Sequence, residues 1–267
     1  MRRDEDPREL QHILKYAILG YVSEDSFDGK RILDFGCGSG SSTAVIARMF
    51  PNTEIVGVDF NNDLLSIARL RAEHYGFNNV TFVLSPGVDN LPSELGSFDY
   101  VILSAVYEHL LPSERETLLP KLWLHLKPGG IMFINQTYYR YFPIESHTTR
   151  LPLINYLSDK VALRLVRMFS SSVGPDDTWE TLLRKGIRGA SVKEISSILN
   201  TTSQKPIFLE PERLGMRDRI DLWYQLSSNA GLMTLRKFFV CCLKILKKIT
   251  GSTITPSLSL AIKKSPL

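Results

Sequence analysis

The stretch that decides the fold is Arg31-Ile32-Leu33-Asp34-Phe35-Gly36-Cys37-Gly38-Ser39-Gly40. A short apolar run ends in an acid, and glycine then stands at every second position until a helical pattern begins at Ser41. Glycine adopts backbone conformations that other residues avoid, and it lets a ligand approach the main chain closely. The stretch therefore predicts a buried strand that turns sharply into a helix at a ligand-binding turn.

The composition is typical of a globular protein that buries a full core. Of the 267 residues, 43% are hydrophobic and 22% are charged. No apolar run reaches the length of about 18 residues that a membrane-spanning helix needs, and the mixed charges of residues 1–7 do not resemble a secretory signal. The cysteines at 37, 241 and 242 match neither a disulfide framework nor a zinc motif. We therefore expect a cytoplasmic protein and assign no metal ligand.

Charge is divided unevenly along the chain. From residue 231 onward there are seven basic residues and no acidic one, whereas residues 1–230 hold 25 basic and 28 acidic residues. A basic segment that follows a mildly acidic body suggests an anionic partner, either a membrane or a nucleic acid.

Apolar runs alternate with helical patterns in the first half of the chain. This alternation predicts a parallel, doubly wound sheet, in which ligands bind beyond the carboxyl ends of the strands. The expected strands are residues 31–35, 54–59, 80–84, 98–104 and 131–134, and the expected helices are residues 9–22, 41–50, 62–76 and 118–126. The ligand-binding edge would then comprise residues 35–40, 59, 85–89, 104–109 and 135–139.

Beyond residue 135 the pattern becomes irregular. We expect further helices near residues 153–169, 191–199, 217–226 and 232–249, and strands at 205–209 and 258–263. Polar and apolar residues alternate in the last strand, which is typical of an antiparallel edge strand. The predicted fold is an α/β, Rossmann-like sheet of five parallel strands and an antiparallel last strand, with helical insertions after strands five and six. Its predicted parts are a cofactor-binding core with an N-terminal helix (1–135), a helical substrate cap (136–205) and a completion of the sheet that includes the basic helix (206–267).

The glycine spacing argues against a dinucleotide. That fingerprint needs a third glycine three positions after the second, where this chain has Ser41. Asp34 favours a cationic or donor-rich group over a diphosphate, and Asp59, which closes the second strand, is placed to accept two ribose hydroxyls. A ligand with a ribose and a cationic amino-acid arm, such as S-adenosylmethionine, satisfies both acids.

Four motifs together resemble class I S-adenosylmethionine-dependent methyltransferases. They are the loop 34–40, Val58-Asp59, Phe98-Asp99-Tyr100-Val101 and Leu126-Lys127-Pro128-Gly129-Gly130. The resemblance implies that S-adenosyl-L-methionine is the cofactor, with its methionine arm at Asp34 and the glycines, its ribose at Asp59 and its adenine at residues 85–89. The residues assigned to the cofactor on this basis are Asp34, Gly36, Cys37, Gly38, Gly40, Asp59, Phe60, Gly87, Val88, Asp89 and Ser104.

Two of these assignments leave alternatives open. In the family an acid often follows the third strand, but that place falls here on Gly87, so either Asp89 or the backbone at Gly87 and Val88 would hold the adenine. Cys37 is either a reactive thiol or a small side chain packed behind the turn, and we expect the second.

The residues that would bind the methyl acceptor are harder to predict from the sequence. Three residues are candidates for catalysis: Tyr107 and His109 after strand four, and His147 in the region beyond strand five. Either histidine has a suitable intrinsic pKa to take a proton from an acceptor hydroxyl, although for His109 we favour the alternative that it caps or braces the next turn. The aromatic side chains of residues 138–142 form either an acceptor wall or the core of the cap.

Residues 232–249 form a basic amphipathic pattern. Phe238, Phe239, Cys242, Leu246 and Ile249 fall on one helical face, with the basic residues mainly across from them. Such a helix either lies in a membrane interface or packs on its own domain. With a membrane surface as partner, the protein would be peripheral on the inner membrane face and the acceptor lipid-like.

The sequence thus predicts methyl transfer to a small-molecule or lipid-like acceptor. A nucleic-acid methyltransferase is the first alternative, but the acidic body offers no broad basic patch and no base-flipping loop follows strand four. The second alternative is a module that binds the cofactor without catalysis.

Overall fold

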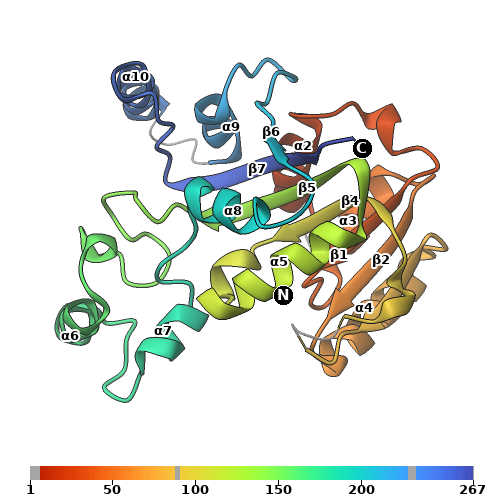
Figure 1. Cartoon of the computed structure of the whole chain (residues 1–267), viewed down its shortest axis with the longest axis horizontal. Coiled ribbons are helices and arrows are strands. Elements are labelled where there is room, and N and C mark those ends of the chain that lie inside the picture. The colour runs from red at the N-terminus through yellow and green to blue at the C-terminus, as the bar shows by residue number, and fades with distance from the viewer. Residues whose placement is uncertain (1–6, 88–90, 228–232, 267) are drawn as a thin grey trace.

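The computed structural model describes residues 7–87, 91–227 and 233–266. Their seven strands form one sheet in the order β3-β2-β1-β4-β5-β7-β6 (Figure 1). The strands are β1 (Arg31–Phe35), β2 (Glu54–Asp59), β3 (Val80–Leu84), β4 (Phe98–Ser104), β5 (Leu126–Tyr138), β6 (Pro206–Phe208) and β7 (Ser257–Lys264). The first five are parallel, and β7 runs antiparallel to both β5 and β6. The predicted Rossmann-like sheet with an antiparallel last strand is confirmed.

Helices cover both faces of this sheet. On one face, α2 (Arg8–Leu19) and α3 (Ser41–Met49) pack on Ile32, Ile55 and Phe133. On the other, α5 (Pro112–His125) and α8 (Val192–Leu199) pack on residues that include Leu33 and Val101 (Figure 1). The helix α4 (Asn62–Tyr75) connects β2 to β3 and is capped by the Asn61 side chain. Neighbouring strand residues point to opposite faces, so the apolar runs 31–35 and 54–59 contribute to both layers.

The order of the strands places a ligand site between β1 and β4. The chain proceeds from β1 outward to β3 and then returns to β4, which pairs with β1 on its other side. At such a switch point the two connecting segments leave in opposite directions, and a crevice forms beyond the carboxyl ends of the strands. The glycine turn follows β1 and the segment 105–109 follows β4, so both lie at this crevice.

Two element boundaries, and the place of one strand in the sheet, differ from the sequence prediction in ways that the structure explains. The helix α5 begins at Pro112 rather than near residue 118, because proline suits the first helical position and the Glu114 carboxylate accepts the N–H of Leu111. The strand β5 begins at Leu126, since the predicted glycine turn is a bulged part of the strand, with Gly129 at a φ of 78°. The strand β7, predicted as an edge, lies between β5 and β6, where the Lys264 ammonium donates to the carbonyl oxygens of Trp123 and Leu126.

Residues 139–190 form an insertion with a small core of its own. It contains the 3-10 turn η4 (Ile154–Tyr156) and the helices α6 (Asp159–Phe169) and α7 (Trp179–Arg184). Ile154, Ala162, Val166, Val173, Leu182 and Ile187 form that core. The two helices stand to one side of the sheet in Figure 1. The predicted division of the chain after residues 135 and 205 stays a prediction.

Two helices precede β7. They are α9 (Arg219–Leu226), which packs on α2, and α10 (Met233–Thr250), which packs on α9. In the described part of the chain no helix combines the length and the apolar character that crossing a membrane requires.

Candidate active site

The glycine turn brings left-handed backbone to the end of β1. Gly36, Gly38 and Gly40 have φ values of 73°, 55° and 76°. A Cβ atom on Gly36 would lie 2.5 Å from Val106 Cγ2, and one on Gly40 would lie 2.8 Å from Ala68 Cβ. A Cβ atom on Gly38 would meet nothing within 4 Å. Packing therefore requires glycine at positions 36 and 40, whereas Gly38 faces open space beside the crevice.

Asp59 joins the end of β2 to this turn. Its Oδ2 atom accepts the N–H of Gly38 at 2.8 Å, and its Oδ1 atom accepts the N–H of Asn61 at 2.9 Å. Each carboxylate oxygen has a second lone pair and can accept a further hydrogen bond. The next residue, Phe60, is 40% exposed, and its ring lies edge-on to Phe35 at 5.5 Å. A half-exposed carboxylate and an exposed aromatic ring thus flank the open side of the turn.

Asp34 and Cys37 lie behind the turn. The Asp34 carboxylate is buried and accepts the Thr43 hydroxyl of α3 at 2.6 Å. Burial, with a smaller contribution from the charge of Asp59, raises the pKa of Asp34 to about 6. The Cys37 side chain is buried against Gly57 of β2, and burial raises the pKa of its thiol far above the usual range. A thiol in this state is a poor nucleophile.

The end of β3 lies beside Asp59. The N–H of Ser85 donates to the Asp59 carbonyl oxygen, and the Ser85 hydroxyl donates to the Gly87 carbonyl oxygen. Gly87 is therefore near the clamp formed by Gly38 and Asp59. The other two predicted adenine-binding residues, Val88 and Asp89, lie outside the described residues.

The end of β4 and its neighbour in β5 carry buried polar groups, of which the sequence analysis assigned only Ser104 to the cofactor. Ser104 and Asn135 are neighbours in the sheet register. The Ser104 hydroxyl and both amide atoms of Asn135 are buried without a hydrogen-bond partner among the described residues. The residues that follow, Ala105 and Gln136, have φ values of 54° and 58°, which are uncommon without glycine and recur at functional sites. A polar residue at the end of a buried apolar strand was the signal for Asn135.

A cavity of about 550 Å³ opens beside these strand ends. This volume falls in the range of roughly 300–1,000 Å³ that ligand pockets occupy. The cavity is lined by segments from α2, the ends of β4 and β5, the insertion, α9 and the start of β7. Its lining residues are Ile13, Ala105, Glu108, His109, Gln136, Tyr138, His147, Trp223, Leu226, Ser227, Pro256, Ser257 and Ser259.

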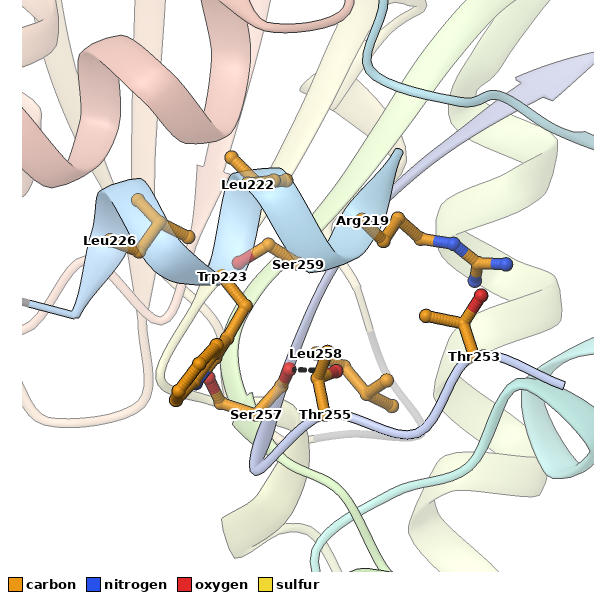
Figure 2. Close-up of a pocket in the computed structure, with 9 residues that line it drawn as sticks. All are labelled: Arg219, Leu222, Trp223, Leu226, Thr253, Thr255, Ser257, Leu258 and Ser259. Atoms are coloured by element: carbon orange, nitrogen blue, oxygen red, sulfur yellow. Dashed lines mark hydrogen bonds between the residues drawn. The ribbon is translucent and has the colours of Figure 1, made fainter. Parts of the chain in front are cut away.

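Figure 2 shows a narrow pocket that adjoins this cavity between α9 and the start of β7. The two share Trp223, Leu226, Ser257 and Ser259. The volume of the pocket is about 10 Å³, which is room for about one water molecule. In Figure 2 the Thr255 hydroxyl donates to the Ser257 carbonyl oxygen across it, at 2.8 Å. The pocket is thus a small recess of the cavity wall, lined by both apolar and hydroxyl side chains.

Two of the three candidate catalytic residues line the cavity. His109 and His147 line it, with ring centroids 5.4 Å apart. The Nδ1 atom of His109 is bonded to the Arg184 carbonyl oxygen at 2.8 Å, and burial lowers the pKa of His147. Tyr107 instead lies in the core, fully buried, with the Arg115 guanidinium over its ring. Of the predicted aromatic wall, Tyr138 lines the cavity.

Two acids near these histidines were not singled out from the sequence. Glu108 is 1% exposed, and its Oε2 atom accepts the Thr137 hydroxyl. Burial raises the pKa of Glu108 above its usual range. Glu145 is also buried and accepts the N–H groups of His147, Thr148 and Thr149. An acid directly before a histidine, in the segment that follows β4, was the available signal for Glu108.

Comparison with known proteins identifies the class. Residues 32–130, from β1 into β5, match the profile of the family described as "Methyltransferase domain". Together with the sheet and the glycine turn, this match shows that residues 32–130 form a domain of the class I S-adenosylmethionine-dependent methyltransferase type. S-adenosylmethionine is the cofactor of that class. The resemblance seen in the four sequence motifs is confirmed.

The curated relatives cover this first half of the chain. Protein-L-isoaspartate O-methyltransferase of Nitrobacter winogradskyi is 34% identical over 124 residues, which are 46% of this chain and 52% of that protein. Trans-aconitate 2-methyltransferase of Methylobacterium radiotolerans is 34% identical over 102 residues, which are 38% and 36% of the two chains. The chain spans about half the length, or less, of these relatives. Their named substrates differ from one another.

Solved structures resemble the whole chain. The YcgJ protein of Bacillus subtilis superposes with a TM-score of 0.53 at 16% identity, covering 98% of this chain and 100% of that one. The plantazolicin methyltransferase BpumL, whose structure contains S-adenosylhomocysteine, superposes with a TM-score of 0.52 at 14% identity, covering 99% and 87%. At these identities the likeness shows a shared fold.

Proposed function

We propose that this protein transfers a methyl group from S-adenosylmethionine to a small-molecule acceptor in the cavity of about 550 Å³. The observation that carries the proposal is the loop after β4. Ala105 lines the cavity, and Val106, the next residue, packs directly against Gly36 of the glycine turn. A cofactor held at the turn would therefore direct its methyl group toward the cavity across a single residue of chain.

The cofactor is proposed to lie along the carboxyl ends of the strands. The main chain of Gly36, Gly38 and Gly40 would hold the methionine arm, with the charge of Asp34 beneath it. Asp59 would accept the ribose hydroxyls with its remaining lone pairs. Phe60 and the segment 85–89 would flank the adenine. Ser104, whose hydroxyl has no partner in the described part of the chain, would meet the methionine arm.

Methyl transfer depends mainly on how the acceptor atom and the methyl group are positioned relative to one another. The acceptor atom attacks the methyl carbon in line with the carbon–sulfur bond, and that bond breaks with its electron pair left on sulfur, so holding the two reactants in line contributes much of the catalysis. A hydroxyl acceptor must also lose its proton. His109 and His147 place basic nitrogens on the cavity wall, whereas Tyr107 does not reach it.

A screen with methyl-labelled S-adenosylmethionine tests the proposal. Hydroxylated aromatic compounds, carboxylic acids, lipids, RNA and DNA are offered in parallel, and label transfer and S-adenosylhomocysteine are both measured. We expect transfer to one class of small molecule, with one S-adenosylhomocysteine formed per methyl group. Transfer to nucleic acid alone, or tight cofactor binding without transfer to any acceptor, would support the alternatives instead.

We further propose that α10 brings the cavity to an anionic membrane, so that the acceptor is lipid-like and the protein lies on the cytoplasmic membrane face. The apolar side chains Leu235, Phe238, Ile245, Leu246 and Ile249 are all exposed. Basic residues instead face α9, where Lys244 pairs with Asp221 and Lys247 with Asp218. The exposed side of α10 is thus largely apolar, and Lys237 and Lys248 are also exposed.

The helix is connected to the cavity by Phe239. Its ring lies against Trp223 of the cavity wall at 5.5 Å. Flotation with phosphatidylserine-containing vesicles tests this surface. We expect Phe238→Ser with Ile249→Ser to lose most binding, and Leu124→Ser, which changes an equally exposed residue of α5, to keep it. Equal flotation of all three proteins would contradict the membrane proposal.

A further inference from the structure

We propose that Glu108, His109 and His147 bind a divalent transition-metal ion of the zinc type on the cavity wall. Each residue offers one ligand atom, and these atoms lie within 4.8 Å of one another. The carboxylate of Glu108 approaches the Nε2 atom of His109 to 4.0 Å. All three residues line the same cavity.

The buried carboxylate lacks a partner on the side that faces the histidines. Glu108 is 1% exposed, and its Oε1 atom has no hydrogen-bond partner among the described residues. The Nε2 atom of His147 is likewise buried and unpartnered within the same part of the chain. A buried oxygen and a buried nitrogen without partners are costly, and a cation shared between them offsets that cost.

The hydrogen bond of His109 leaves the correct nitrogen for a ligand. Its Nδ1 atom lies 2.8 Å from the Arg184 carbonyl oxygen, which can only accept. The proton must therefore be on Nδ1, which leaves a lone pair on Nε2, and that nitrogen lies 4.0 Å from Glu108 Oε1. Metal-binding histidines commonly donate their second nitrogen to a backbone carbonyl in this way.

Neighbouring residues also hold the other two proposed ligands, Glu108 and His147, in position. The Thr137 hydroxyl donates to Glu108 Oε2 at 3.0 Å, which leaves Oε1 for the ion. The Glu145 carboxylate fixes the backbone of His147, and the Tyr138 ring stacks on the imidazole at 4.3 Å. Gly186 gives the imidazole room, since a Cβ atom there would lie 2.4 Å from His147 Cδ2.

The donor set selects the class of ion. Two imidazoles and one carboxylate are typical of catalytic zinc and of non-haem iron, whereas magnesium and calcium prefer oxygen ligands. At metal–ligand distances of about 2.1 Å the three atoms would be about 3.4 Å apart, so the side chains must close by about an ångström. Three protein ligands leave coordination positions open toward the cavity.

Such an ion would act on the acceptor, a role that rests on the proposed function. An acceptor oxygen bound to a divalent cation loses its proton more readily, and it is held in one place for the attack on the methyl carbon. The imidazoles would then serve as ligands, and the acceptor proton would leave to solvent. Ion binding itself does not depend on methyl transfer.

Calorimetry with ZnCl₂ on the tag-free, chelator-treated chain tests the site, with Co²⁺ absorption as a second readout. We expect one ion per chain and a Kd in the micromolar range or tighter. Separate His147→Ala and Glu108→Gln variants should each weaken binding at least 100-fold and lose the cobalt spectrum. His74→Ala, which changes an exposed histidine of α4, should bind as the wild type does.

Circular dichroism of each variant establishes that it is folded, and if Glu108→Gln is not, the His147→Ala variant alone carries the test. Absence of stoichiometric Zn²⁺ binding in the wild type, or equal affinity in the folded variants, would overturn the site. Cofactor calorimetry on the same samples separates the two proposals. A wild type that binds S-adenosylmethionine but no zinc contradicts the metal site alone, whereas zinc binding without methyl transfer to any acceptor contradicts the proposed function alone.

Discussion

The proposed cofactor side and the proposed acceptor side of the candidate site are built in different ways. On the cofactor side, Gly38 lies in the turn after β1 and Asp59 ends the neighbouring strand β2, and the hydrogen bond between them spans 21 positions of the sequence. On the acceptor side, Glu108, His147 and Trp223 come from a 3-10 turn, an insertion and a late helix. A local motif thus encodes the proposed cofactor site, whereas the proposed acceptor site exists only after the whole chain has folded.

The largest expected effect on stability comes from a substitution on the cofactor side. In Gly40→Ala the new Cβ atom would lie 2.8 Å from Ala68 Cβ, and a methyl group cannot move away by changing its rotamer. The backbone at residue 40 also has a φ of 76°. Left-handed strain and overpacking together should lower the free energy of unfolding by about 2–4 kcal/mol in urea titrations. The control is Gly29→Ala, which has a φ of 67° and no neighbour within 4 Å, and should cost only about 1 kcal/mol. Equal losses would contradict the packing argument.

This comparison explains how far the sequence could be interpreted. The parallel strands and the glycine turn were predictable because apolar runs, periodicity and turn glycines are local signals. The start of β5 was missed because Gly129 forms a bulge within a strand where a turn was expected. The cluster of Glu108 with His147 could not be predicted, since only the fold of the insertion brings them together.

The second prediction concerns the buried acid beneath the turn. The pKa of Asp34 in the folded chain is about 6, above the unfolded value of 3.8, so the folded state holds an extra proton between these values. The contribution of Asp34 to wild-type stability should therefore fall as the pH rises from about 4 to 6, and stay level above that. Asp34→Asn removes the titration and should be more stable at pH 7.5 by up to about 3 kcal/mol.

Urea titrations of both proteins from pH 4 to 7.5 measure this difference. We expect the two stabilities to be similar near pH 4 and to separate as the pH rises through 6. A constant difference across the range would mean that Asp34 does not titrate as its burial requires. Cofactor affinity, measured on the same samples, shows whether the carboxylate also attracts the methionine arm, in which case the Asn variant binds more weakly.

The third prediction disturbs only the acceptor side. Glu145→Gln replaces the charged acceptor of the N–H groups of His147, Thr148 and Thr149 with an amide, and should cost about 1–3 kcal/mol locally. Hydrogen exchange should quicken in the turn 145–149 and remain unchanged in residues 31–59. Glu180→Gln, at an exposed position of α7, should change neither. Quickened exchange in both regions would show that the two sides are one cooperative unit.

The central claim is that Asp59, which is hydrogen-bonded to Gly38, binds the ribose of the cofactor. Calorimetry with S-adenosylmethionine on wild type and Asp59→Ala tests this claim most directly. Loss of charged hydrogen bonds to the ribose should weaken binding roughly 10–100-fold. Asp63→Ala, which removes an exposed acid four residues along the chain, should bind as the wild type does. Unchanged affinity in Asp59→Ala would contradict the assignment of the ribose to Asp59.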